Sequence, residues 1–200
     1  MTEPDPRFDA LLAKPAIRLA KLGLVHASIW LLLFCMFAAA QSWYQLSSLG
    51  IAALLAIITG AAAGFATTNL IHEWFHLLGA VVAGGRYTIP AKLGMFAYDW
   101  DFKANNTSQF FTMSIAGSIG GAVAVVLLWW ALDMATTGQV AIIAGAVASF
   151  IFAAIIEWPV LWRTRRSGEP LAELSKIGPG VLLRALIGSV IGGMVVFSWC

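Results

Sequence analysis

Five long apolar runs divide this chain, and they constrain its fold more than any other feature. They cover residues 22–44, 51–83, 109–132, 140–162 and 179–199. Each run is long enough to cross a bilayer as a helix, which takes about 20 residues. The whole chain is 60% hydrophobic and only 11% charged. This composition excludes a soluble domain and predicts a single transmembrane domain over residues 22–199.

The residues before the first run predict a different environment. Residues 1–21 are polar and then weakly amphipathic, which indicates a tail that leads into a helix on the membrane surface. They do not look like a signal peptide, because the first apolar run begins only after about twenty mostly polar residues. Cys35 and Cys200 are too few for a disulfide framework or a cysteine metal site.

The segment 84–108 interrupts the helical pattern. Residues 86–89 and 94–102 have the composition of two short strands, with Pro90 and Gly94 as turn signals. Aromatic residues alternate with Asp99 and Asp101, and we interpret these two carboxylates as a solvated strand face rather than as metal ligands. The sequence therefore predicts an all-α multi-pass membrane protein of about five transmembrane helices, with a short β-like hairpin after the second.

The basic residues predict an orientation. All twelve Lys and Arg residues fall in the tail, in 84–108, in 163–176 or at Arg184. Five spans place these segments on one side, which the positive-inside rule assigns to the cytoplasm together with the N-terminus. The small size predicts a bacterial inner membrane. The lipid bilayer is the expected partner, and no basic patch with interleaved aromatics points to nucleic acid. The oligomeric state stays open, a homo-oligomer included.

One short motif in the second run carries chemistry. His72, Glu73 and His76 are the only ionisable side chains between Gly50 and Gly84. Positions i and i+4 share a helix face, so the two imidazoles can bind one divalent metal such as Zn²⁺, with Glu73 as general base. An ionisable side chain at bilayer depth is costly and marks a functional site. Asn69, one turn earlier, is either a substrate or second-layer contact or a packing residue.

Taken together, these residues resemble the site-2 protease family of intramembrane zinc metalloproteases. The histidine motif is followed by a glycine exit at Gly84-Gly85, and Ser114-Ile115-Ala116-Gly117 is similar to the start of the family's A-G-P-x-x-N element. Ser118 stands in place of the Pro, Gly121 in place of the Asn, and no Asp-Gly pair occurs. The resemblance is to a minimal, divergent member without a PDZ domain.

This resemblance implies hydrolysis of membrane-protein substrates, with Zn²⁺ held by His72, His76 and a third, acidic ligand near the end of the fourth run. We favour Glu169, in Ser167-Gly168-Glu169-Pro170, because the family carries an Asp-Gly ligand in this region. Glu157, inside the run itself, is the alternative ligand, or a residue that orients the substrate or a histidine. His26 is a further candidate ligand, unless it is hydrogen-bonded to a neighbouring carbonyl.

Other functions fit part of the pattern. The departures from the family's motifs are compatible with a non-catalytic assembly factor that keeps the fold. Haem or another pigment could bind through His72, His76 or His26. The CAAX-type membrane metalloproteases also pair this histidine motif with a Glu ligand, but their catalytic part lies largely outside the bilayer, which does not fit a motif within an apolar run.

Overall fold

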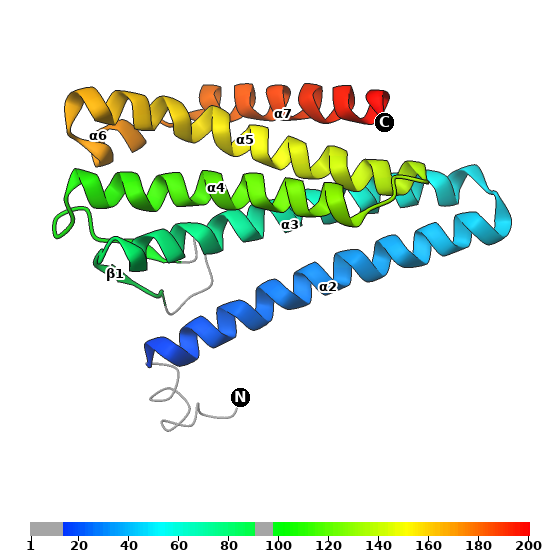
Figure 1. Cartoon of the computed structure of the whole chain (residues 1–200), viewed down its shortest axis with the longest axis horizontal. Coiled ribbons are helices and arrows are strands. Elements are labelled where there is room, and N and C mark those ends of the chain that lie inside the picture. The colour runs from blue at the N-terminus through cyan, green and yellow to red at the C-terminus, as the bar shows by residue number, and fades with distance from the viewer. Residues whose placement is uncertain (1–13, 91–97) are drawn as a thin grey trace, which may run out of the picture.

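The computed structural model describes residues 14–90 and 98–200, and five long helices dominate it (Figure 1). They are α2 (Pro15–Ser47), α3 (Gly50–Val82), α4 (Thr107–Ala131), α5 (Thr137–Ser167) and α7 (Pro179–Trp199), with a short α6 (Pro170–Leu174) between α5 and α7. All five long helices are apolar enough to cross a membrane. Many of their large apolar side chains are exposed, as lipid contact requires. The predicted multi-pass helical fold is confirmed.

Two helices extend beyond the predicted runs. The first begins at Pro15, where proline suits the first helical position, so residues 15–21 form its opening turns; residues 1–13 lie outside the described part. The fourth continues through Pro159 to Ser167 and ends at Gly168, whose φ of 73° is readily adopted by glycine. The apolar runs are shorter than these two helices, because polar and charged residues form the start of α2 and the end of α5.

Helix α3 is the centre of the bundle and packs against α2, α4 and α5, while α7 packs on the far side of α5 (Figure 1). Glycines allow the backbones of α3 and α5 to approach closely. A Cβ on Gly64 would overlap the carbonyl of Ile142, and a Cβ on Gly145 would overlap that of Ala61. This close packing brings the motif-bearing helix against α5.

A small hairpin follows α3. Strands β1 (Tyr87–Thr88) and β2 (Asp99–Trp100) pair antiparallel, with Tyr87 opposite Trp100. This agrees with the predicted hairpin, although the regular pairing is shorter than the predicted segments and residues 91–97 lie outside the described part. Asp99 is exposed. Asp101 accepts backbone N–H bonds from Lys103 and Ala104, so it organises a turn.

The start of α4 is fixed to the end of α3. Asn106 caps α4 through a reciprocal pair of hydrogen bonds with Gln109. The Gln109 side-chain amide also donates to the carbonyls of Ala83 and Gly84, each at 3.2 Å. These bonds hold the two helices in register about two turns beyond His76.

The basic residues gather at one end of the bundle. The start of α2, the hairpin and α6 all lie at that end, and the α2–α3 connection lies at the other (Figure 1). The described Lys and Arg residues lie in the first turns of α2 and α7, beside the hairpin, or around the end of α5 and α6: Lys14, Arg18, Lys21, Arg86, Lys103, Arg163, Arg165, Arg166, Lys176 and Arg184. The histidine motif lies in the half of α3 nearer this end.

Candidate metal site

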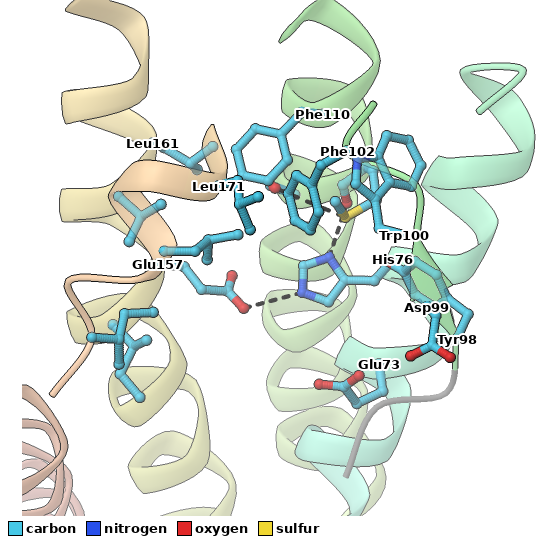
Figure 2. A pocket seen from close by; sticks show the side chains of 16 residues that line it. Glu73, His76, Tyr98, Asp99, Trp100, Phe102, Phe110, Glu157, Leu161 and Leu171 are labelled. Atoms are coloured by element: carbon cyan, nitrogen blue, oxygen red, sulfur yellow. Dashed lines mark hydrogen bonds and ion pairs between the residues drawn. The ribbon is translucent and has the colours of Figure 1, made fainter. Parts of the chain in front are cut away.

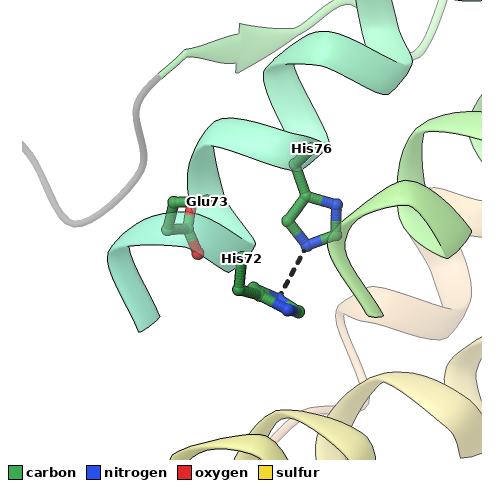
Figure 3. Close-up of side chains that lie close together, drawn as sticks. All are labelled: His72, Glu73 and His76. Carbon is green, nitrogen blue, oxygen red and sulfur yellow. Dashed lines mark hydrogen bonds between the residues drawn. The ribbon is translucent and has the colours of Figure 1, made fainter. Parts of the chain in front are cut away.

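The two histidines of the motif lie one turn apart on the buried face of α3 and point toward α4 and α5 (Figure 3). Their Nε2 atoms are 2.9 Å apart. Glu73 lies beside them, and one donor atom from each of His72, Glu73 and His76 falls within 4.8 Å of the others. This group could hold a metal ion.

A second carboxylate completes the cluster from α5. One oxygen of Glu157, Oε1, lies 2.8 Å from His72 Nε2. The same oxygen lies 3.1 Å from His76 Nε2, and Figure 2 shows this second contact. With the distance of 2.9 Å between the nitrogens, these atoms form a nearly equilateral triangle. Ligands bonded to tetrahedral zinc at about 2.0–2.1 Å lie about 3.3 Å from one another. The triangle is therefore slightly smaller than one face of such a site.

Hydrogen bonding sets the protonation of His76. Its Nδ1 lies 2.9 Å from the backbone carbonyl of Met113, and a carbonyl can only accept, so Nδ1 carries the proton. In the neutral ring, Nε2 then presents a lone pair to the triangle, as a metal ligand requires. The Glu157 carboxylate is also an acceptor. Two acceptors at hydrogen-bond distance need a cation or a proton between them, which fits a metal site.

Two further atoms of the cluster lack partners. His72 Nδ1 and Glu157 Oε2 are buried, and neither makes a hydrogen bond to any described residue. A buried polar atom without a partner is costly. A ligand or water that enters the cluster would relieve this cost, at least for the Glu157 oxygen.

Glycine in α4 makes room for the His76 ring. A Cβ on Gly117 would overlap three atoms of the imidazole. We expect Gly117→Ala to displace His76, to weaken zinc affinity by at least about tenfold and to destabilise the fold by about 1–3 kcal/mol. Zinc titration and thermal unfolding measure the two effects. Gly180→Ala is the matched control, because a Cβ there has nothing within 4 Å. Unchanged zinc affinity in Gly117→Ala would refute this role of Gly117.

The structure does not bring Glu169 to the histidines. This residue is exposed at the start of α6, where its backbone N–H donates to Ser167 Oγ. The reason is the length of α5, which continues for ten residues beyond Glu157 and so carries Glu169 roughly 15 Å further along the helix axis. The preference for Glu169 over Glu157 came from the position of the family's Asp-Gly ligand, and in this structure Glu157, not Glu169, lies beside the histidines.

The remaining candidates also lie apart from the cluster. Asn69 is exposed on α3, one turn before Glu73, and does not line the pocket described below. His26 on α2 accepts a hydrogen bond from Trp74 Nε1 at 3.1 Å, through its Nδ1. It links α2 to α3 and does not join the metal-binding group.

A pocket of about 570 Å³ opens beside the cluster (Figure 2). Glu73, His76 and Glu157 line one part of it. The other lining residues come from β2 and the residues on either side of it, from α4, α5 and α6, and from the residues that follow α6. This volume is in the range of small-molecule and cofactor sites, about 300–1,000 Å³. The cluster therefore lies beside a cavity large enough for a small molecule.

One wall of the pocket is held by an ion-paired carboxylate. Glu173 of α6 accepts from Arg163 Nε of α5 at 2.9 Å and from Lys176 Nζ at 2.7 Å. The hydrogen bond from Lys176, with a further contribution from Arg163, holds the pKa of Glu173 below its usual range. These contacts fix α6 against α5 beside the pocket.

Sequence reasoning did not identify several of these features. The Met113 carbonyl that orients His76, the clearance at Gly117 and the wall formed by α6 all depend on tertiary packing. Gly117 and Gly121 are four residues apart, a spacing that indicates helix packing in general rather than space for an imidazole.

The fold and this site define a multi-pass helical membrane protein with a buried group that could hold a metal ion. Comparisons with protein-family models, with curated proteins and with solved structures found no match.

Proposed function

We propose that this chain is an intramembrane zinc metalloprotease that hydrolyses peptide bonds in or near transmembrane segments of other proteins. One observation carries the proposal: two imidazole nitrogens and a carboxylate oxygen converge within 3.1 Å of one another, beside a second carboxylate and an apolar pocket. Two histidines and one glutamate are a known zinc ligand set for peptide hydrolysis.

In this proposal, His72, His76 and Glu157 hold the metal. A bound zinc ion supplies Lewis-acid chemistry, because it polarises a scissile carbonyl and lowers the pKa of water. The Met113 carbonyl keeps His76 in the tautomer that exposes Nε2. Glu157 contributes a negative charge that lies between both imidazoles and is partly shielded from solvent.

Glu73 acts as the general base. It belongs to the same turn of α3 as the two histidines. In the part of the chain that the structure describes it makes no hydrogen bond to either of them, so its carboxylate is available to a water molecule. It accepts the proton of the attacking water and delivers it to the leaving amine. Its position on the lining of the pocket gives it access to a bound peptide.

The orientation follows from the distribution of charge. By the positive-inside rule the basic end of the bundle faces the cytoplasm, so the N-terminus and the mouth of the pocket lie on that side. Water then reaches the site from the cytoplasmic surface. A substrate segment enters from the bilayer and is cut near its cytoplasmic end.

The pigment-binding alternative fits this geometry less well. The two Nε2 atoms are 2.9 Å apart, and a planar macrocycle cannot lie between them. A non-catalytic assembly factor would keep the same metal cluster, so hydrolysis itself is the discriminating property.

Metal removal is the direct test of hydrolysis. The purified protein is reconstituted in vesicles with synthetic apolar transmembrane peptides that carry a central helix-breaking Pro-Gly, and products are identified by mass spectrometry. We expect cleavage that falls at least about a hundredfold after treatment with 1,10-phenanthroline and returns with added Zn²⁺. Absence of any cleavage by the zinc-loaded protein, across a panel of such peptides, would favour the assembly-factor alternative.

A further inference from the structure

The pocket beside the cluster has a marked division between polar and apolar lining. Its carboxylate and imidazole groups are Glu73, His76, Asp99 and Glu157, and apart from Ser114, the Tyr98 hydroxyl and the Trp100 indole N–H the rest of the lining is apolar. Three residues that line it, Phe110, Met113 and Val160, are 3%, 6% and 2% exposed and form a buried apolar floor. A polar side chain that entered this part would lose hydration without gaining a partner.

The apolar part lies next to the proposed reacting groups, on α4, α5 and α6. Val160 follows Glu157 by one turn on α5, and Phe110 and Met113 lie on α4, whose Met113 carbonyl orients His76. Figure 2 shows Leu161 and Leu171 on the side of the pocket where Glu157 lies, and Glu73 and Asp99 on the opposite side. A peptide bond placed at the cluster therefore has one neighbouring side chain directed toward the apolar floor.

We propose that this pocket selects a large apolar side chain, such as Leu, Phe or Trp, on a residue that flanks the scissile bond. This inference rests on the proposed function and adds the class of residue that the enzyme requires at its cleavage site. Burial of such a side chain contributes favourable free energy in proportion to its apolar area, which Ala or Gly cannot supply.

The α6 wall is part of the selectivity device. Leu171 and Leu174 line the pocket from a helix of only five residues, which is too short to be stable by itself. The Arg163–Glu173 ion pair ties this helix to α5 at 2.9 Å. Glu173 is therefore a positioning residue, because it fixes the wall without reaching the reacting atoms.

The test measures cleavage preference rather than total activity. A set of transmembrane peptides differs only in the residue that precedes or follows a Pro-Gly break: Gly, Ala, Leu, Phe, Trp or Asp. We expect the wild-type protein to cut beside Leu, Phe or Trp at least tenfold faster than beside Ala, and not measurably beside Asp. Equal rates for Ala and Phe would overturn the proposal and leave the protease function intact.

Variants that fill the pocket should change this ratio. Val160→Phe occupies the floor and Leu171→Trp narrows the mouth, where Leu171 is 56% exposed. Both should lower the Phe-to-Ala ratio at least tenfold while zinc content stays at the wild-type level. Leu186→Trp is the matched control, because Leu186 is 54% exposed on α7 and does not line the pocket. An unchanged ratio in both pocket variants contradicts the proposal.

Loss of the ion pair should act in the same direction. Arg163→Gln should lower the Phe-to-Ala ratio because α6 is no longer tied to α5, whereas Arg165→Gln removes an equal charge from an exposed position nearby and should leave the ratio unchanged. If both substitutions lower the Phe-to-Ala ratio equally, the cause is the loss of surface charge and not the position of α6.

Photocrosslinking separates this inference from the proposed function. A transmembrane peptide that carries benzoylphenylalanine beside the Pro-Gly break is irradiated with the Glu73→Gln protein, and the attachment site is mapped by mass spectrometry. Attachment at Val160, Leu171 or Leu174 without any cleavage by the wild type would support the pocket and reject hydrolysis. Cleavage by the wild type together with attachment only on lipid-facing residues would support hydrolysis and reject the pocket as the binding site of the flanking side chain. A copurified lipid that the peptide cannot displace from the pocket would also overturn the proposal.

Discussion

Replacement of Glu73 by glutamine should abolish hydrolysis and leave the metal in place. The glutamine side chain has nearly the shape of the carboxylate but cannot accept the proton of the attacking water. Loss of a general base lowers turnover by about 10²–10⁴-fold. The three atoms that converge at the cluster belong to His72, His76 and Glu157. Because Glu73 contributes none of them, its replacement should change zinc affinity by less than about tenfold. Cleavage rates in vesicles and zinc titration give the two numbers.

The matched control for this substitution is Glu169→Gln. It removes the same charge from an exposed glutamate on the same basic end of the bundle, and cleavage should stay within twofold of the wild type. A Glu73→Gln protein that hydrolyses peptides at more than a tenth of the wild-type rate would mean that another group takes the proton. A Glu73→Gln protein that loses its zinc would mean that Glu73 is a ligand.

Replacement of Glu157 by glutamine should remove the metal itself. Its carboxylate oxygen contacts both imidazole nitrogens, at 2.8 and 3.1 Å. Loss of a partner that merely orients a ligand weakens metal affinity by about 10–100-fold, so loss of a direct ligand should cost at least a hundredfold. Hydrolysis should disappear together with the zinc.

Thermal unfolding detects the same loss without any assay of activity. A ligand that binds only the folded protein stabilises it by RT ln(1 + [L]/Kd), so added zinc should raise the Tm of the wild type. It should have little effect on Glu157→Gln and its full effect on Glu169→Gln. If zinc stabilises Glu157→Gln as strongly as the wild type, then Glu157 is not a ligand.

The apo form of Glu157→Gln is informative as well. In the absence of metal, the wild type holds a carboxylate against two imidazoles in a buried cluster, with Oε2 lacking a partner among the described residues. Glutamine replaces this charged acceptor by a neutral amide, and loss of one partner of a buried ion pair is destabilising, so the metal-free variant should be less stable than the metal-free wild type. Equal stability of the two metal-free proteins would show that the carboxylate forms no stabilising pair with the histidines.

Local patterns in the sequence were sufficient for the helices and for half of the site. The apolar runs predict the spans because a bilayer requires about 20 apolar residues per helix. The spacing of His72 and His76 places both rings on one helix face in any helical fold. Glu73 follows from the same motif.

The third proposed ligand, a carboxylate, could not be predicted in this way. Whether Glu157 or Glu169 meets the histidines depends on where α5 ends and how closely it approaches α3. Helix α5 continues beyond the apolar run to Ser167, and the contacts at Gly64 and Gly145 bring α5 and α3 together. The α6 wall depends on the Arg163–Glu173 pair, whose partners are ten residues apart and could equally have formed a solvated surface contact.

X-ray absorption at the zinc edge of the purified, zinc-loaded protein examines the proposed cluster most directly. We expect one zinc per chain, with two imidazole nitrogens at about 2.0–2.1 Å and carboxylate oxygen at about 2.0–2.2 Å. The same spectrum should be obtained from Glu169→Gln and lost in Glu157→Gln. A wild-type protein that takes up no stoichiometric zinc, or a spectrum that Glu157→Gln leaves unchanged, would contradict a metal site built from His72, His76 and Glu157.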